Sequence, residues 1–440
     1  MITVITRSNT DKIVNDGLRR DAEYYLDMYD RFLGKLTAFG IKVDDYNDEA
    51  ERTEIVGRLR KLGVSVRNSE KSFVLGNISP SCLDCRTGEG SSTHILSLKC
   101  NRDCYFCANK NQLDYEELQT RKNDIIDQFN KSAAYFGVMK SVAITGGEPL
   151  LFPDECEKFI RYVKMADEKI QTRIYTNGDL ADEKLMERLG KAGLDEARFG
   201  LKPDNNGAVE PNVIKNLKSA KSAIPRVMVE MPCKTGQLEN MKALLDKLDD
   251  AGIFGVNILE YLFPWAHTEE YNREGYKIRY RPYRILFDYA YAGGAPVAGS
   301  EIECLKLMEY AAEKKYKMGV HYCSLENKLT SQIWLHNHKF RKTQLEHFSE
   351  KDFFVRTAKG YDNDAHRIKE ILDSKKCKDY IYNKNERRIE FPMGKIPLLA
   401  GNNMQIGISV LVQDWQDGKS VVREVAIHLT DADSFSMNDI

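Results

Sequence analysis

The chain contains the stretch HILSLKCNRDCYFC at residues 94–107, in which an apolar run leads into Cys100, Cys104 and Cys107. Three thiolates with three and then two residues between them can each ligate one iron of a cubane cluster, which leaves the fourth iron without a protein ligand. Such an open iron is a site for chemistry. A zinc knuckle is the alternative interpretation, but zinc needs a fourth ligand at similar local spacing, which is not found here.

A second motif, Gly146-Gly147-Glu148-Pro149, ends the next expected strand. Its two glycines allow a ligand to approach the backbone, and Glu148 supplies an acceptor for an ammonium group. The cysteine spacing, the aromatic Phe106 before the last cysteine and this motif together resemble the radical SAM superfamily. In that family the open iron is chelated by the amine and carboxylate of S-adenosylmethionine.

The resemblance implies a [4Fe-4S] cluster on the three cysteines, reductive cleavage of S-adenosylmethionine and a 5′-deoxyadenosyl radical that abstracts a substrate hydrogen. It also implies contacts to the cofactor, which we expect at Phe106, Gly146, Gly147, Glu148, Pro149, Thr176, Asn177, Lys202, Glu230 and Asn257. Arg198 is the alternative to Lys202 as the partner of the methionine carboxylate. Polar residues at strand ends also serve to terminate strands, and Asn177 alone fits a turn with a helix cap equally well.

Strands and helices alternate strictly from residue 94 onward. We expect strands at 94–98, 141–145, 172–176, 197–201, 226–231, 255–259 and 318–322, and helices near 114–135, 154–169, 182–192, 209–223, 238–251 and 301–317. Repeated strand and helix units form parallel sheets with right-handed crossovers. The pattern therefore predicts an α/β fold with a partial barrel, whose chemistry lies at the carboxyl ends of its strands. The resemblance implies that this is a (β/α)6-type radical SAM barrel.

The remaining sequence predicts two additions to this barrel. Residues 1–75 read as a helical N-terminal α/β accessory module, 76–325 as the barrel, and 326–440 as a small mixed or β C-terminal extension. An insertion at 263–300, rich in tyrosine and arginine, is too long for an ordinary connection and predicts an ordered lid.

A second group of cysteines suggests another metal site. Cys82 and Cys85 have the spacing of half a metal site, and Cys323 falls at the end of the last expected strand. An auxiliary iron-sulfur cluster and a zinc staple both remain open, as do ordinary buried thiols. Because eight residues separate Cys85 from the first strand, the pair can reach back to the catalytic face beside Cys323.

Charge and hydropathy exclude several classes of function. The 65 lysines and arginines against 66 acidic residues give a net charge of −1, so we expect neither nucleic acid nor an anionic membrane as a partner. No apolar run is long enough to span a bilayer, and the N-terminus does not resemble a signal peptide. The chain has ten cysteines, three of them in a metal-ligand spacing, which predicts metal chemistry in a reducing compartment, so we expect a cytoplasmic protein.

The leading hypothesis is a radical SAM enzyme that modifies an unactivated carbon, with a peptide or protein as substrate. A small-molecule tailoring enzyme and a glycyl-radical activase are alternatives, and an iron-sulfur scaffold or electron-transfer protein is the alternative from another class. Glu148 and Gly147 speak against the last, because an electron carrier needs no amino-acid pocket beside its cluster. An enzyme of this kind requires an electron donor such as flavodoxin or ferredoxin. The sequence does not specify the substrate.

Overall fold

The computed structural model describes residues 1–38, 40–83, 86–112, 114–201, 209–263, 268–280, 295–339, 343–416 and 419–440. These form two compact units. Of the described residues, the barrel unit comprises those from 40 to 280 and from 295 to 329, and the terminal unit comprises those from 1 to 38 and from 330 to 440.

The barrel unit is built on a curved sheet whose strand order is β2-β3-β12-β9-β8-β7-β6-β5-β4. Neighbours from β4 to β12 pair in parallel, whereas β3 is antiparallel to both β12 and β2. The strands are β2 (Ser65–Arg67), β3 (Ser72–Leu75), β4 (Ser91–Ser97), β5 (Ser141–Gly146), β6 (Gln171–Thr176), β7 (Glu196–Gly200), β8 (Arg226–Cys233), β9 (Gly255–Glu260) and β12 (Gly319–Cys323). All seven strands predicted for the barrel are confirmed.

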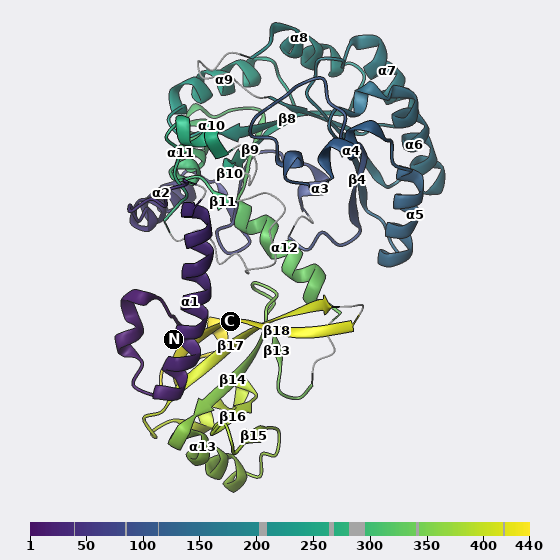
Figure 1. Ribbon diagram of the computed structural model, residues 1–440. Coiled ribbons are helices and arrows are strands. Elements are labelled where there is room, and N and C mark those ends of the chain that lie inside the picture. The colour runs from purple at the N-terminus through teal and green to yellow at the C-terminus, as the bar shows by residue number, and fades with distance from the viewer. Residues whose placement is uncertain are drawn as a thin grey trace. The chain divides into compact units, whose positions relative to one another are not determined.

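Helices cover the convex face of this sheet, as Figure 1 shows for α5 to α9. The helices of the unit are α2 (Glu49–Lys61), α3 (Pro80–Leu83), α4 (Tyr115–Thr120), α5 (Ile125–Phe136), α6 (Pro153–Ala166), α7 (Glu183–Ala192), α8 (Pro211–Ala220), α9 (Leu238–Asp250), α10 (Thr268–Arg273) and α11 (Ser300–Lys314). The helix predicted at 114–135 is divided into α4 and α5 because the Asp124 side chain accepts from the Ile126 and Asp127 amides and begins a new helix.

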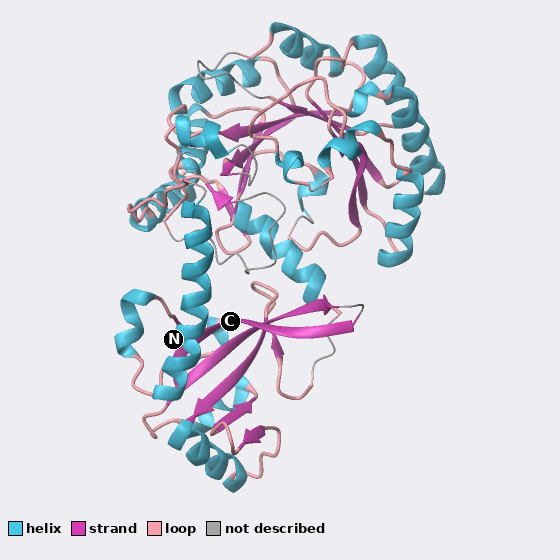
Figure 2. Ribbon diagram, in the orientation of Figure 1, coloured by secondary structure: helices cyan, strands magenta, loops and turns pink. Residues whose placement is uncertain are grey.

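The two faces of the barrel sheet differ in chemistry. Residues such as Ile174, Phe199 and Val229 face the helices and belong to one buried apolar core. Because side chains alternate along a strand, their neighbours point to the concave side. There the sheet carries polar and charged residues at adjacent registers, among them Tyr175, Arg198, Glu230, Asn257 and His321. The concave face, seen with its magenta strands in Figure 2, is therefore suited to bind polar ligands.

The terminal unit is a second, antiparallel sheet in the order β1-β18-β17-β14-β16-β15, with β13 paired to β14. Its elements are β1 (Thr3–Val4), α1 (Asp16–Ala38), β13 (His347–Phe348), β14 (Val355–Tyr361), α13 (Asp362–Ser374), β15 (Ile381–Asn383), β16 (Arg388–Phe391), β17 (Gln405–Gln416) and β18 (Lys419–Asp431). α13 packs its apolar side on one face, and α1 places Leu18 and Ala22 against Tyr361 and Ile427. Helix α12 (Leu325–Asn337) contains the boundary between the units.

The compact units divide the N-terminal region differently from the predicted module at 1–75. Strand β1 pairs with β18, so residues 1–38 belong to the terminal unit. Strands β2 and β3 instead extend the barrel sheet beyond β12. Both pairings join segments far apart in the chain, which the local pattern of apolar residues does not encode.

The predicted lid at 263–300 is described only in part, since residues 264–267 and 281–294 lie outside the described ranges. The described portions are anchored to the barrel unit. Strand β10 (Leu262–Phe263) pairs with β11 (Ala295–Pro296), and Ile278 bridges to Val43 and Val297. Arg279 forms an ion pair with Asp48 at 3.1 Å. The ends of the insertion are thus held by backbone pairing.

Candidate functional site

The first cysteine follows the point where β4 and β5 approach each other most closely. The Gly147 amide donates to the Ser97 carbonyl at 2.8 Å, and the Glu148 amide donates to the Lys99 carbonyl at 2.8 Å. A Cβ atom on Gly146 would lie 2.0 Å from the Ser97 oxygen, and one on Gly147 would lie 2.2 Å from the Lys99 oxygen. The two glycines are therefore required by the backbone that leads into the cysteines.

Glu148 is a buried carboxylate, 1% exposed, that joins the ends of two strands. Its Oε1 accepts from the Thr176 hydroxyl at 2.8 Å and the Leu150 amide at 3.0 Å, and its Oε2 accepts from the Asn177 amide at 2.6 Å. Burial raises the pKa of Glu148, and these hydrogen bonds oppose the shift. A carboxylate can accept about four hydrogen bonds, so capacity for about one further donor remains. Pro149 begins the short buried turn Pro149–Leu151.

Polar side chains after β6 hold the cysteine loop, which we define as residues 100–107. Asn177 Nδ2 donates to Asn101 Oδ1 at 2.7 Å and lies 3.9 Å from Cys100 Sγ. Asp179 accepts from Asn101 Nδ2 at 2.9 Å and from Arg102 Nε at 2.7 Å, with a further contact to the same guanidinium. The predicted Thr176 and Asn177 thus connect the β5 motif to the first cysteine.

Aromatic side chains support the other end of the cysteine loop. The Tyr261 hydroxyl lies 3.0 Å from the Tyr105 hydroxyl, and the Phe106 ring packs edge-on to Tyr261 at 5.8 Å. Lys234 Nζ lies over the Phe106 ring at 5.2 Å. Tyr271 from α10 also packs on Tyr105, with ring centroids 5.5 Å apart. Phe106 is therefore part of a packed aromatic cluster beside the last cysteine.

The thiols of the cysteine loop fit a cluster better than the other thiols do. Cys100, Cys104 and Cys107 are partly exposed, whereas Cys156 and Cys233 are fully buried in the apolar core. The Arg102 amide donates to Cys100 Sγ at 3.4 Å, and hydrogen bonds to ligand sulfurs help to set a cluster's potential. In the described residues no three Cys, His, Asp or Glu side chains converge on one metal ion. A cubane cluster does not require this, because each cysteine binds a different iron.

A charged network occupies the concave face farther along the sheet. Arg198, 4% exposed, donates from Nε to Glu196 at 2.6 Å and from Nη1 to Glu230 at 2.8 Å. Its Nη2 donates to Ser81 Oγ at 3.0 Å and to Cys82 Sγ at 3.3 Å. Burial opposes the charge, but the facing acidic groups outweigh this and raise the pKa of Arg198. Arg198 is therefore already satisfied by protein partners.

The network continues from Glu230 across β9 to β12. Asn257 Nδ2 donates to Glu230 Oε1 at 3.1 Å, and Asn257 Oδ1 lies 3.1 Å from His321 Nδ1. The other ring nitrogen of His321 is 3.0 Å from the Ser72 hydroxyl. Burial lowers the pKa of His321. Glu230 and Asn257, both predicted as cofactor contacts, are thus joined to each other and to a histidine that the sequence did not single out.

The tentative second metal site is only partly described. Cys82 on α3 lies on the concave side, next to Arg198 and 3.9 Å from Asn257 Nδ2. Ser79, just before α3, contacts Glu196 at the start of β7, so α3 enters the barrel from the amino ends of the strands. Cys323 Sγ accepts from Asn327 Nδ2 at 3.3 Å. Cys85 lies outside the described residues, as does the predicted cofactor contact Lys202.

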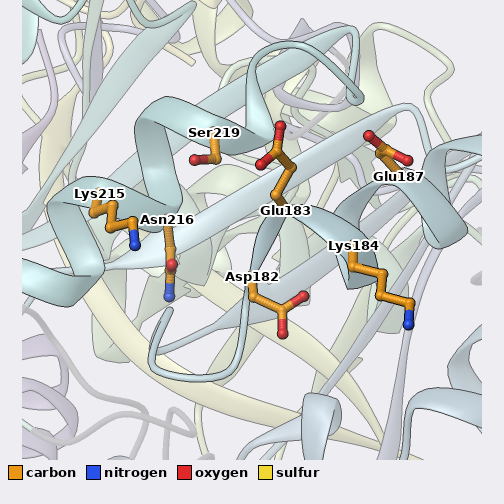
Figure 3. A pocket seen from close by; sticks show the side chains of 7 residues that line it. All are labelled: Asp182, Glu183, Lys184, Glu187, Lys215, Asn216 and Ser219. Carbon is orange, nitrogen blue, oxygen red and sulfur yellow. The ribbon is translucent and has the colours of Figure 1, made fainter.

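A hollow of about 390 Å³ lies on the convex side, between α7 and α8 (Figure 3). Its lining is polar and includes the exposed Glu183, Glu187 and Lys215. Asn216 at this hollow donates to the Gly178 carbonyl at 2.9 Å and to the Asp179 carbonyl at 3.3 Å. We assign the Asn216 side chain a supporting role, because it holds residues 178–179, the segment that anchors the cysteine loop.

Several site residues were missed by the sequence analysis. Asp179 and Arg102 stand in loops without a pattern of their own. Tyr175 and His321 did carry a signal, because parallel strands buried on both faces are usually continuous apolar runs, which these polar residues interrupt. Arg198 was named from the sequence only as a partner of the methionine carboxylate, and its place in the charged network was not predicted. In Glu196-Ala197-Arg198-Phe199, charged residues alternate with apolar ones, which indicates that one face of the strand is polar. This alternation would have predicted a charged network on the concave face.

The geometry defines an open α/β barrel with a three-cysteine loop at the carboxyl end of its first parallel strand. The family model described as "Radical SAM superfamily" matches residues 95–264. Residues 95–264 therefore form a domain of the radical SAM type.

Curated relatives and solved structures resemble different shares of the chain. A putative glycyl-radical enzyme activating enzyme of Methanocaldococcus jannaschii is 25% identical over 322 residues, covering 69% of this chain and 80% of that protein. The PqqA peptide cyclase of Granulibacter bethesdensis is 28% identical over 171 residues, covering 38% of this chain and 44% of that protein. SuiB of Streptococcus suis bound to precursor peptide SuiA is 14% identical, with a TM-score of 0.36, covering 72% of this chain and 67% of that chain.

The comparisons support the cofactors at the level of the family. The match to the superfamily implies S-adenosylmethionine and a [4Fe-4S] cluster as its cofactors. Across the described ranges, no helix is both long and apolar enough to cross a membrane.

Proposed function

We propose that this radical SAM enzyme acts on a carbon atom of a polypeptide, with Cys100, Cys104 and Cys107 as the ligands of its [4Fe-4S] cluster. The anchoring of the cysteine loop supports this assignment, because Asn177 and Asp179 hold its first residues at the edge where the parallel strands end. When bound, the cluster and S-adenosylmethionine supply a 5′-deoxyadenosyl radical for hydrogen abstraction. The remaining acceptor capacity of Glu148 suits the methionine ammonium group.

The protein's own residues position these groups and exclude water. The close approach of Gly146 and Gly147 to the Ser97–Lys99 backbone packs the two strand ends tightly behind the loop. The aromatic cluster of Tyr105, Phe106 and Tyr261 covers its other end. Shielding of this kind suits a reactive radical, which attacks most C–H bonds that it meets. The insertion at 263–300 is proposed to act as a lid over the substrate.

The names of two relatives support a polypeptide substrate. One is named for activating a glycyl-radical enzyme, which is a protein, and the other for cyclising the PqqA peptide. A glycyl-radical activase is therefore a special case of the same proposal. Small-molecule chemistry is the second candidate, because a probable GTP 3′,8-cyclase of Methanocaldococcus jannaschii is 35% identical over 106 residues, though these cover only 34% of that protein.

The cellular setting follows from the same chemistry. A flavodoxin or ferredoxin is proposed as electron donor, since the cluster must be reduced before it reacts. No disulfide links the nine cysteines that the structure describes, which supports a reducing compartment such as the cytoplasm. An auxiliary cluster or zinc ion at Cys82, Cys85 and Cys323 is a further proposal, and metal analysis of Cys82→Ala tests it.

The substrate class is tested by following deuterium. The protein is reconstituted anaerobically with iron, sulfide, dithionite and S-adenosylmethionine, then incubated with a perdeuterated cell extract divided into polypeptide and small-molecule fractions. We expect deuterium in 5′-deoxyadenosine from the polypeptide fraction, with loss of transfer after protease digestion. Deuterium from the small-molecule fraction alone would refute the polypeptide proposal and favour the second candidate. The triple Cys→Ala variant is the control.

A further inference from the structure

Arg173 is a nearly buried cation on the concave face of β6. Only 9% of the residue is exposed. Its Nε–H has no hydrogen-bond acceptor, and within the described ranges no ion pair or side-chain hydrogen bond involves its guanidinium group. The guanidinium carbon of Arg173 lies over the ring of Tyr175, 5.8 Å from its centroid. A buried donor without an acceptor is unfavourable, so such groups in native proteins call for an explanation.

Arg198 on the adjacent strand lies in the same environment, but its guanidinium group has hydrogen-bond acceptors. It lies over the same Tyr175 ring at 5.5 Å, and it shares the concave face with Arg173. However, it donates to Glu196, Glu230, Ser79, Ser81 and Cys82. Two guanidinium groups thus flank one aromatic ring, and only one of them has anionic hydrogen-bond partners.

Glu196 does not satisfy Arg173, although it lies near enough to sense its charge. The charge of Arg173 helps to lower the pKa of Glu196, against the effect of burial and after that of Arg198. The oxygens of Glu196 are engaged by Arg198 Nε at 2.6 Å, Ser79 Oγ at 2.6 Å and Arg226 Nε at 3.4 Å.

The charges on neighbouring strands also indicate that an anion is missing beside Arg173. On β6, β7 and β8 the concave face carries three arginines, Arg173, Arg198 and Arg226, against two carboxylates, Glu196 and Glu230. The excess positive charge corresponds to the arginine without an acceptor. An anion in the barrel would balance the charge and accept the vacant donors together.

We propose that Arg173 binds a carboxylate group of the substrate inside the barrel. A guanidinium group presents two parallel N–H donors that match a carboxylate, and it is more weakly hydrated than an ammonium group. Arg173 on β6 lies four residues before Asn177, which directly follows the end of this strand, so about 13 Å separate the two positions in extended backbone. A carboxylate held there leaves the neighbouring part of the substrate directed toward the cysteine loop.

This inference rests on the proposed polypeptide substrate, for which a carboxylate has two sources: an acidic side chain and the C-terminal group. Three probes distinguish them, namely an N-acetylated, C-amidated Gly-Glu-Gly peptide, the same peptide with Gln in place of Glu, and N-acetyl-Gly-Gly-Gly with a free carboxyl end. Their binding to the reconstituted holoenzyme is measured by isothermal titration calorimetry. Binding needs no turnover, so its outcome is separate from that of the deuterium experiment.

We expect at least one carboxylate peptide to bind more tightly than the Gln peptide. Arg173→Gln should weaken that binding by about 10- to 100-fold, because a charge-assisted pair is lost, and Arg173→Lys should restore part of it. Basal cleavage of S-adenosylmethionine without substrate provides the readout that shows whether the cofactor end is intact. The proposal is overturned if neither carboxylate peptide binds more tightly than the Gln peptide. It is also overturned if the carboxylate peptide that binds more tightly to the wild type binds Arg173→Gln with the same affinity. Binding of inorganic phosphate but of neither carboxylate peptide also overturns it.

A stability measurement separates ligand binding from a structural role. If Arg173 serves a ligand, Arg173→Met should keep or raise the melting temperature of the protein without substrate, since a buried unpaired charge is removed. A structural role predicts a marked decrease instead, and that result would overturn the proposal.

Discussion

The cysteine-loop end of strands β4–β6 and the concave face of β7, β8, β9 and β12 belong to one sheet but are stabilised by different interactions. At the first, glycines let backbones meet, Asn177 donates a hydrogen bond to Asn101, and Asp179 accepts from Asn101 and from the Arg102 guanidinium group of a partly exposed loop. At the second, buried charges satisfy each other around Arg198. The cysteine loop, proposed to bind the cofactor, is thus held by contacts with the strand ends. The concave face, proposed to face the substrate, is held by pairs of buried charges.

The largest effect is expected from the three cysteines of the loop. A triple Cys→Ala variant of Cys100, Cys104 and Cys107 should lose its oxygen-sensitive cluster and all formation of 5′-deoxyadenosine. Iron analysis and the visible spectrum after anaerobic reconstitution measure this. Cys377→Ala, which removes a partly exposed thiol in the terminal unit, is the matched control. Full iron content in the triple variant would show that the ligands lie elsewhere.

The charged network should depend strongly on its central arginine. Arg198→Met leaves Glu196 and Glu230 buried without their cation, which should destabilise the barrel unit by about 3–5 kcal/mol. Urea unfolding followed by circular dichroism measures the change. Arg121→Met removes the exposed ion pair with Glu117 and should cost less than about 1 kcal/mol. Equal effects of the two substitutions would contradict a network that depends on buried charge.

The cysteine-loop end should be sensitive to a single methyl group. Gly147→Ala places a Cβ atom 2.2 Å from the Lys99 carbonyl oxygen, so the loop backbone must move. We expect destabilisation of about 2–3 kcal/mol and poorer cluster incorporation. Gly57→Ala in α2, where nothing lies within 4 Å of the added Cβ, should instead stabilise by about 0.5–1 kcal/mol. A Gly147→Ala protein with wild-type stability would remove the close-approach argument.

The smallest effect concerns pH and the strand that leads into the loop. Burial lowers the pKa of His94 on β4 from 6.5 to about 4. The unfolded chain therefore takes up a proton at higher pH than the folded one, so stability is full above about pH 6.5 and falls toward pH 4. By pH 5 the loss is about 2 kcal/mol. His94→Leu should flatten this part of the urea-midpoint profile, whereas substitution of the exposed His366 should leave it unchanged. An unaltered slope in His94→Leu would assign the acid sensitivity to other groups.

Glu148 shows how the structure sharpens an expectation from sequence. Glu148→Ala is the obvious test of cofactor binding, but it would also leave the Asn177 and Leu150 amides without their acceptor. Since Asn177 holds the cysteine loop, such a variant perturbs cofactor and cluster together. Glu148→Gln, which keeps one oxygen acceptor, is the more specific probe of the methionine ammonium group.

Local sequence determined the elements of the barrel and the identity of its cofactor end. The strands β4 to β9 and β12 and most of the helices follow from apolar periodicity, because each unit buries one face against the next. The spacing of Cys100, Cys104 and Cys107 and the Gly146–Pro149 motif sufficed to identify the superfamily, because a cluster and a tight turn impose residue types at fixed separations.

Tertiary structure alone decided which distant residues meet. It joined β1 to β18 and β2–β3 to β12, and so placed 1–38 and 39–75 in different units. It also paired Arg198 with Glu196, Glu230 and Cys82, yet left Arg173 on the next strand without an acceptor. The physical reason is that strand pairing and buried charge balance depend on neighbours across the sheet, whose positions no local pattern along the chain encodes.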